Sequence, residues 1–507
     1  MPQPKWYHKS LAELCMDSIV DNMEKWTASR SSVHVSSLFY LLPSHCLEYM
    51  TLEWVKRNHW GKKKEMFELL LNPHLKILDL SKWNMHITDS LHIVRLASVR
   101  CSQLTALKMG FFNKLPSYQV EDTFTPMLQL FEHLQILDLC DTIYGASCMI
   151  NLGLTDKPKL RELQVNSCPG VTDSAMQVFC NGQSSLQKLS VNRTEVTHSG
   201  IRFAIEHLPE LKELNCDDDS DILRAFRRIR KETRESKKYS LTKWFMWTPP
   251  DEVSYKKGSV SLMVDMCPSL VEVDVFLQVN DEGFTDEELL GFRKLQQLKH
   301  FGIQISFLPS IISIRGGVIP LLQARGLLLE ELYLSMQVTS EEVDLIIESC
   351  PNIRRLLLIL ERTDLLDTPE PVVHDGVHSS LCSSKKVFPL RMLEDISLSS
   401  YFSYAISRKL LLLLLSSPAL TAVSIYNSFT LDDQIIEEAC AKNSFKYLTK
   451  LRLYGCSNVS QKGIDFFLNE TNPLDEISVE DCGNVNLGHM KTMAQEKHWN
   501  VKWNDED

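Results

Sequence analysis

One six-residue pattern recurs through most of this sequence and constrains its fold more than any other feature. An apolar residue is followed by two other residues, a second apolar residue, one other residue and a third apolar residue, as in LKILDL at Leu75. The pattern begins at Leu75, Leu104, Leu134, Leu160, Leu186, Leu211, Leu270, Leu298, Leu329, Ile353, Leu393, Leu420, Leu448 and Leu474, and most starts lie 24 to 31 residues apart. A repeat of this length predicts a stack of similar structural units.

Each unit is predicted to contain a short strand and a helix. The last two apolar residues of the pattern alternate along the strand and point into the core, while their neighbours face outward. After the pattern at Leu160, the segment 171–179 (VTDSAMQVF) has apolar residues at helical spacing behind a helix start signal. One unit cannot bury its own apolar side, so the units must stack. Three cysteines that follow strands are expected to be buried and to bond the turn backbone: Cys168, Cys456 and Cys482.

These units resemble the cysteine-containing leucine-rich repeats of F-box and related ubiquitin-ligase receptors. The resemblance covers roughly residues 73–507. It implies the α/β fold class, in the form of a curved leucine-rich-repeat solenoid with a parallel inner sheet and outer helices. Residues 1–72 lack the repeat and are predicted to form a small all-α region that precedes the solenoid.

Two interruptions of the repeat predict insertions at about 217–262 and 361–389. The first contains a basic run, Arg227–Lys238, followed by Trp244, Phe245 and Trp247. Basic residues beside aromatic ones are suited to an acidic peptide or a nucleic-acid strand, and the basic run alone could act as a nuclear address. The alternative is a degenerate repeat whose helix has a solvated charged face.

Composition and motif content limit the classes of function. A net charge of -11 disfavours nucleic acid as the main partner. The chain starts without a secretory signal and its longest apolar run, Leu410–Leu415, is too short to span a bilayer, so we expect a cytoplasmic or nuclear protein that does not bind membranes. The sequence has no C-x-x-C pair, P-loop, G-x-S-x-G or H-E-x-x-H motif. We therefore expect no metal, no cofactor and no enzymatic activity.

The N-terminal region begins with a predicted amphipathic helix. Ser10 and Glu13 form an S-x-x-E capping box, which predicts a helix that starts at Leu11 and continues to about Trp26. One apolar stripe would run along this helix. The stripe consists of Leu11, Leu14, Cys15 and Ile19.

The stretch SLAELCMDSI also resembles the BC box, the helix by which substrate receptors bind Elongin C. The resemblance implies that a leucine enters a pocket of Elongin C and that a cysteine permits close approach of the two proteins. The Elongin C-binding residues that it implies are Ser10, Leu11, Leu14, Cys15 and Ile19.

A Leu-Pro segment follows at Leu41–Leu47 and resembles the cullin-2 box of receptors of the von Hippel–Lindau class. It lacks the L-P-L-P core of the cullin-5 version. The cullin-binding residues that it implies are Leu42, Pro43, Cys46 and Leu47. Together, the two resemblances imply the substrate-recognition subunit of a cullin-2–Elongin B/C RING ubiquitin ligase.

Two other functions fit the sequence. An F-box receptor of the SCF class would begin at the same Leu-Pro, but residues 55–75 do not continue the F-box pattern convincingly. A repeat scaffold or inhibitor outside the ligases would use residues 1–72 only as a cap, with Leu11 and Ile19 packed on the first repeat. For each function we expect an unknown protein ligand on the outward strand positions. Candidates are Gln164, Asn166, Ser190, Asn192, Asn215, Arg452 and Tyr454.

Overall fold

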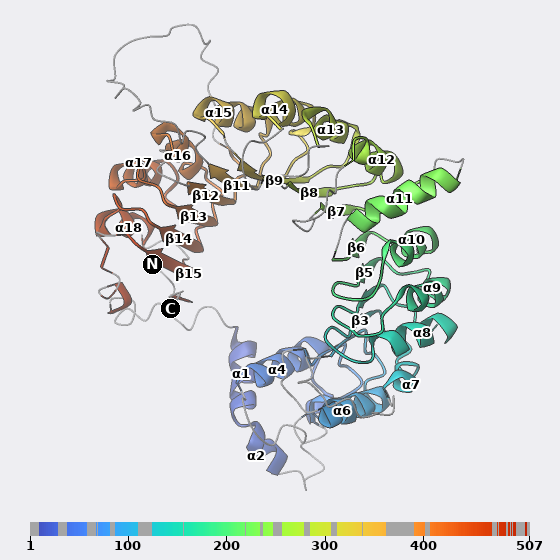
Figure 1. The fold of residues 1–507 in the computed structure, drawn as a ribbon. Helices are drawn as coiled ribbons and strands as arrows, with labels where there is room; N and C mark the ends of the chain where they lie inside the picture. The colour runs from blue at the N-terminus through green and yellow to red at the C-terminus, as the bar shows by residue number, and fades with distance from the viewer. Residues whose placement is uncertain are drawn as a thin grey trace, which may run out of the picture. The chain divides into compact units, whose positions relative to one another are not determined.

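The computed structural model contains two compact units, here called the N-terminal unit (Lys9–Trp244 with Asp265–Ser269) and the C-terminal unit (mainly Phe245–Val264 and Leu270–Asp507). The structure describes residues 10–28, 38–57, 67, 69–81, 87–109, 124–155, 157–217, 220–233, 237–246, 256–277, 284–305, 312–336, 338–360, 390–400, 406–468, 474, 476–482, 485–486, 488, 490–492 and 502–503. Within each unit, the strands lie along the inner side of an arc and the helices lie outside them (Figure 1).

The N-terminal unit starts with helices and continues as a parallel six-stranded sheet in the order β1 to β6. The first helices are α1 (Leu11–Asp21), α2 (Met23–Ala28) and α4 (Ser44–Arg57). The strands are β1 (Ile77–Asp79), β2 (Ala106–Lys108), β3 (Ile136–Asp138), β4 (Glu162–Gln164), β5 (Lys188–Ser190) and β6 (Glu213–Asn215). The helices between and after them are α6 (Ile87–Arg100), α7 (Thr125–Leu128), α8 (Gly145–Thr155), α9 (Asp173–Gly182), α10 (His198–His207) and α11 (Ser220–Glu232).

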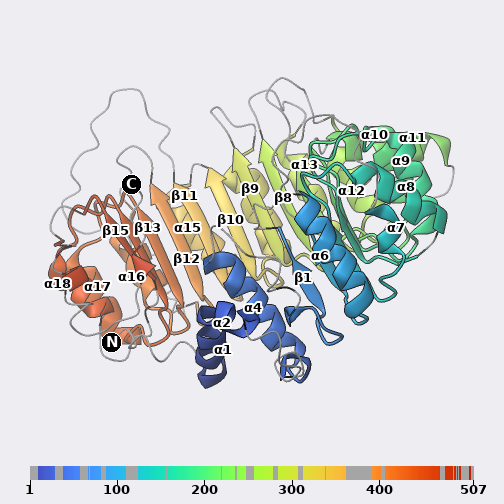
Figure 2. The same cartoon turned by 90° about the horizontal axis from the view of Figure 1, so that it is seen from below.

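The C-terminal unit has a ten-stranded sheet in which strands also follow chain order, from β7 to β16. Strands β8 to β15 lie side by side (Figure 2). They are β7 (Lys243–Met246), β8 (Glu272–Leu277), β9 (His300–Ile305), β10 (Glu331–Met336), β11 (Arg355–Leu360), β12 (Asp395–Ser400), β13 (Ala422–Tyr426), β14 (Lys450–Tyr454), β15 (Glu476–Glu480) and β16 (Lys502–Trp503). The helices are α12 (Ser259–Met266), α13 (Asp286–Leu290), a 3-10 helix (Gly291–Lys294), a π-helix (Ile314–Val318), α14 (Ile319–Arg325), α15 (Ser340–Ser349), α16 (Arg408–Leu415), α17 (Asp433–Asn443) and α18 (Gln461–Phe467).

The repeated apolar residues form the core, and the predicted leucine-rich-repeat fold is confirmed. In β4, Leu163 is buried between the half-buried Glu162 and Gln164, and the longer strands β8 and β12 alternate in the same way. The thiol of Cys168 is buried and donates a hydrogen bond to the carbonyl oxygen of Leu139 at 3.0 Å, as its position after a strand predicted. Each repeat therefore supplies one strand and one buried helix face to a continuous core.

Neighbouring repeats are also joined by a polar contact that the sequence analysis did not identify. Asp433 is the first residue of α17, and its carboxylate accepts hydrogen bonds from the backbone N–H, at 2.8 Å, and the hydroxyl of Ser460 in the next repeat. Gly463 permits this approach, because a Cβ there would lie 2.4 Å from Asp433 Oδ1. The same arrangement joins Asp173 to Thr197 and Gly200, and Asp286 to Ser313 and Gly316.

The segment 217–262 contains a repeat, which corrects the predicted insertion. Helix α11 and strand β7 lie within it, and Leu241, Trp244 and Met246 occupy the three apolar positions of the six-residue pattern. All three side chains are buried. Tryptophan and methionine stand where most repeats have leucine or another aliphatic residue, and this hides the pattern in the sequence.

Helix α11 matches the alternative interpretation, a degenerate repeat with a solvated charged face. Phe226 and Ile229 are buried, whereas Arg224, Arg228 and Arg230 are exposed. The second interruption, 361–389, and Trp247 lie outside the described residues. Across the described part of the chain, no helix is both long enough and apolar enough to cross a membrane.

Candidate functional site

The helix predicted to bind Elongin C forms, and its start is fixed by the predicted capping box. Ser10 Oγ accepts a hydrogen bond from the backbone N–H of Glu13 at 3.2 Å, and the Glu13 carboxylate accepts one from the Ser10 N–H at 2.6 Å. Helix α1 ends at Asp21, earlier than expected, and α2 continues from Met23 after a break at Asn22. Capping satisfies N–H groups that would otherwise lack partners, so it fixes where the helix begins.

Most of the predicted apolar stripe of α1 faces solvent. Leu11 is 78% exposed, Leu14 is 42% exposed, and Cys15 is also exposed, while Ile19 is half-buried. We call these four residues the α1 ridge. An open hollow of about 360 Å³ lies beside Ile19 and continues the ridge towards α2. The hollow is lined by Ser18, Ile19, Asn22, Lys25 and Trp26.

A different face of the same helices holds them to the chain. Met16 and Val20 of α1 and Met23 of α2 are buried, and α1 packs against α4. Tyr49 of α4 donates a hydrogen bond to Asp17 Oδ1 at 3.1 Å. At 100° per residue, the buried Met16 and Val20 lie far around the helix from Leu11, so α1 is anchored without using its ridge.

The Leu-Pro segment is partly available to a partner. Pro43 is exposed, and Leu42 and Cys46 are half-buried, as a binding role would allow. Leu47 lies on the buried face of α4 and is fully buried, which corrects its predicted place on a cullin-binding surface. The period of α4 explains this, because Leu47 shares a face with the buried Met50 and Trp54.

Sequence reasoning missed three exposed apolar residues that precede α4. They are Leu38, Tyr40 and Leu41, of which Leu41 is 79% exposed. Phe39 between them is buried, and its carbonyl oxygen accepts a hydrogen bond from the Asn72 side chain at 3.0 Å. The four residues Leu38–Leu41 are all apolar, so the sequence held no signal that Phe39 alone is buried.

The predicted ligand-binding residues of the N-terminal unit divide into exposed and structural groups. Gln164 and Asn215 lie on the inner strands, half-buried and exposed respectively, and the half-buried Asn192 lies in the turn after β5. Ser190 is almost fully buried and donates its hydroxyl to Asn166 Oδ1 at 2.8 Å, so its assignment to a binding surface is corrected. Asn166 Oδ1 also accepts the backbone N–H of Asn192 at 2.8 Å. Such side-chain bonds to neighbouring repeats stabilise the turns after the strands.

In the C-terminal unit, Arg452 and Tyr454 both lie on β14 and reach the surface. Arg452 Nε donates to Glu476 Oε1 at 2.8 Å, and this bond raises the pKa of the guanidinium group. Tyr454 is 40% exposed. Arg452 is therefore held by its neighbour, while Tyr454 keeps a large surface for contact.

An ion cluster and a pocket on the inner face of the C-terminal unit were not found from the sequence. His300 of β9 lies between two carboxylates, with Nε2 2.8 Å from Asp274 Oδ1 and Nδ1 3.1 Å from Glu331 Oε2. Both ring nitrogens can donate only when the imidazole is protonated. Burial alone would lower the pKa of His300, but the hydrogen bonds and charges of Asp274 and Glu331 outweigh burial and raise this pKa.

We expect the contribution of this cluster to the free energy of unfolding to decrease as the pH rises. A folded-state pKa above the unfolded value means that His300 adds stability below the unfolded value of about 6.5, and that this stability is lost as pH rises through the folded pKa. We expect the urea midpoint of the wild type to exceed that of His300→Gln at about pH 6 and the difference to shrink by about pH 9. A difference that grows with pH would contradict the ion cluster.

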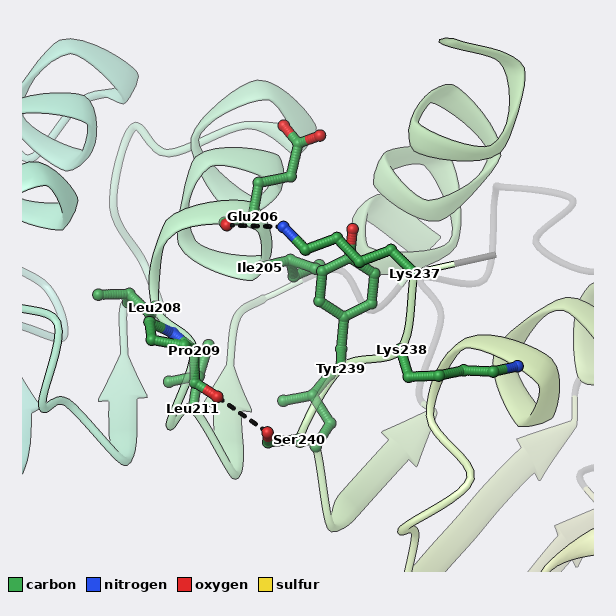
Figure 3. A pocket seen from close by; sticks show the side chains of 10 residues that line it. Ile205, Glu206, Leu208, Pro209, Leu211, Lys237, Lys238, Tyr239 and Ser240 are labelled. Carbon is green, nitrogen blue, oxygen red and sulfur yellow. Dashed lines mark hydrogen bonds between the residues drawn. The ribbon is translucent and has the colours of Figure 1, made fainter. Parts of the chain in front are cut away.

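The basic and aromatic residues at 217–262 mostly serve the fold. Figure 3 shows Lys237 reaching the carbonyl oxygen of Glu206, at 3.4 Å, and Ser240 donating to the carbonyl of Pro209, at 2.8 Å. Lys238 donates to the carbonyl oxygen of Asp265. The pocket that these residues line with Tyr239 has a volume of only about 100 Å³, and burial raises the pKa of Tyr239 to about 12. The space is too small for a peptide side chain and its backbone.

Comparisons with known proteins give only distant likenesses. No model of a known family and no curated protein matches the sequence. A chain in the crystal structure of the Rad7 and Elc1 complex in yeast matches with a TM-score of 0.46 and 14% identity, over 90% of this chain and 96% of that one. A leucine-rich-repeat protein of Leptospira interrogans matches with a TM-score of 0.33 and 15% identity, over 88% and 93%. The fold assignment rests on the repeats themselves.

Proposed function

We propose that this protein is the substrate-recognition subunit of a cullin-2–Elongin B/C RING ubiquitin ligase. The observation that carries the proposal is the α1 ridge. Leu11, Leu14 and Cys15 are exposed on a helix that is already anchored by its opposite face. An exposed apolar helix face of this kind is the surface that inserts into a groove of a partner protein.

The exposure of Leu11 argues against the alternative in which the N-terminal helices are only a cap. A cap would bury Leu11 against the first repeat, but Leu11 is exposed, and the packing is provided by Met16 and Val20 instead. A cysteine in the ridge leaves room for the backbone of a partner helix, which a larger side chain would keep at a distance. The pattern of the ridge is therefore better suited to docking than to capping.

The cullin would contact the segment before α4. Leu41 and Pro43 are exposed there, just before the helix that packs against α1. We assign this role to Leu41, Leu42, Pro43 and Cys46, and leave out the buried Leu47. Cullin-2 is favoured over cullin-5 by the absence of an L-P-L-P core.

The protein itself would perform no chemistry. Ubiquitin transfer would be carried out by the RING protein and the ubiquitin-charged enzyme, and the repeats would hold a substrate protein beside them. Tethering a substrate lysine near an activated thioester raises the effective concentration of the two reactants and so accelerates transfer.

The test is affinity purification of the whole chain from cells, with Elongin C quantified by mass spectrometry. We expect Leu11→Ala combined with Cys15→Phe to reduce Elongin C by tenfold or more, because a fully buried leucine contributes about 1.5–3 kcal/mol. Leu154→Ala, at a residue of α8 that is 74% exposed, is the matched control and should retain Elongin C. Unchanged Elongin C in the double variant contradicts the proposal, and recovery of the SCF adaptor instead supports the F-box alternative.

A further inference from the structure

A pocket of about 270 Å³ lies on the inner face of the C-terminal unit, across β9 to β12. Its apolar part comes from Tyr333 on β10 and Leu357 on β11, which are paired neighbours in the sheet. Both side chains are half-buried and point away from the core, since the alternate residues Leu332, Leu334 and Leu356 are the buried ones. The core therefore does not require a tyrosine or a leucine at these two positions.

Tyr333 and Leu357 are the two large apolar residues in a row that is otherwise mostly polar. The sheet register places seven residues in one row, from β8 to β14: Asp274, Gly302, Tyr333, Leu357, Ser397, Ser424 and Arg452. Apart from Gly302, all the other members are polar. Gly302 makes room for the Asp274 carboxylate beside Tyr333, because a Cβ there would lie 1.9 Å from Asp274 Oδ1.

Glu331 contacts both cationic side chains that line the pocket, which leaves the second carboxylate, that of Asp395, without a hydrogen-bond donor among the described residues. His300 and Arg355 are both held by Glu331, at 3.1 and 3.0 Å. Asp395 is half-buried, and its carboxylate accepts no hydrogen bond from any residue that the structure describes. Burial raises the pKa of Asp395, and the cations Arg355, Lys450 and Arg452 act against this rise.

These features select a neutral ligand with an apolar body and one hydrogen-bond donor. A lysine or arginine side chain would meet the three cations around Asp395, and an acidic one would meet the carboxylates of Asp395 and Glu331. A phenylalanine or leucine would leave the half-buried carboxylate without a donor. Tyrosine and tryptophan combine a large apolar ring with a single O–H or N–H donor.

We propose that this pocket binds a tryptophan or tyrosine side chain of a protein partner, with the ring on Tyr333 and Leu357 and its N–H or O–H donated to Asp395. The inference rests on the proposed function only in taking that partner to be a ubiquitination substrate. Binding at the pocket needs neither Elongin C nor the cullin, so it can be measured and can fail independently of ligase assembly.

The test uses the full chain and small amino-acid amides as probes in ligand-observed saturation-transfer NMR. N-acetyl-tryptophanamide is expected to bind about tenfold more tightly than N-acetyl-phenylalaninamide, because it donates a hydrogen bond to a carboxylate. N-acetyl-lysinamide should bind more weakly than the tryptophan probe. Equal binding of the tryptophan and phenylalanine probes overturns the proposal.

Three variants locate the probe. Leu357→Glu should abolish binding of the tryptophan probe, and Ser424→Glu, in the same row but outside the pocket, should leave it unchanged. Asp395→Ala should reduce the preference for tryptophan over phenylalanine to less than about twofold. If Leu357→Glu does not fold, Leu357→Ser replaces it, since serine already stands at Ser397 and Ser424. Binding that survives the substitution at Leu357 places the probe elsewhere and also overturns the proposal.

Discussion

Val20→Asp is expected to detach α1 from α4 and to abolish Elongin C binding. Val20 is 1% exposed, on the face of α1 that is turned away from the ridge. The substitution removes a buried aliphatic side chain and places a carboxylate in an apolar contact, which together should cost more than about 3 kcal/mol. Hydrogen exchange of residues 10–57 should rise sharply, because this pair of helices can open without unfolding the repeats.

Leu11→Asp is the matched variant on the exposed face of the same helix. Its side chain is already in solvent, so stability should change by less than about 0.5 kcal/mol and hydrogen exchange of residues 10–57 should stay as in the wild type. Elongin C should nevertheless be lost, because a charge cannot enter an apolar pocket without a large desolvation cost. If Leu11→Asp instead loosens α1 as Val20→Asp does, the ridge holds the helix to its own chain and the docking proposal loses its basis.

These two variants also mark what the sequence could predict about the N-terminal region. The capping box and the Leu11–Ile19 stripe were readable, because hydrogen-bonding residues and helical period are local properties. The choice of buried face was not readable, because Met16, Val20 and Met23 form a second apolar face with its own helical spacing. Which face is buried depends on where α4 packs, and that position is set by residues far along the chain.

The repeats were predictable for a related reason, and the pocket was not. Leucines at fixed spacing identify the strands, because each repeat must bury the same positions. The pocket depends on which residues become neighbours across strands, such as Tyr333 with Gly302 and Leu357. These pairs are separated by whole repeats of unequal length, and pairing His300 with Asp274 and Glu331 requires the register of the folded sheet.

The segment 217–262 shows where the six-residue apolar pattern fails to identify a repeat. Its strand has tryptophan and methionine at two core positions, and its helix has a basic exposed face, so composition suggested an insertion for ligand binding. In the folded chain, the side chain of Trp244 replaces the leucine of an ordinary repeat. An aromatic residue in a basic segment is therefore evidence for a binding site only when it does not occupy a core position of the repeat pattern.

Trp244→Ala is accordingly expected to be strongly destabilising, by about 3–5 kcal/mol, because it leaves a large cavity in the core. Trp244 is 3% exposed, whereas the adjacent Phe245 is 57% exposed, so Phe245→Ala is the matched control and should change stability by less than about 0.5 kcal/mol. Urea unfolding of both variants, followed by circular dichroism, measures the difference. Comparable small effects would mean that Trp244 is free to serve a ligand, and would restore the interpretation of this segment as an insertion.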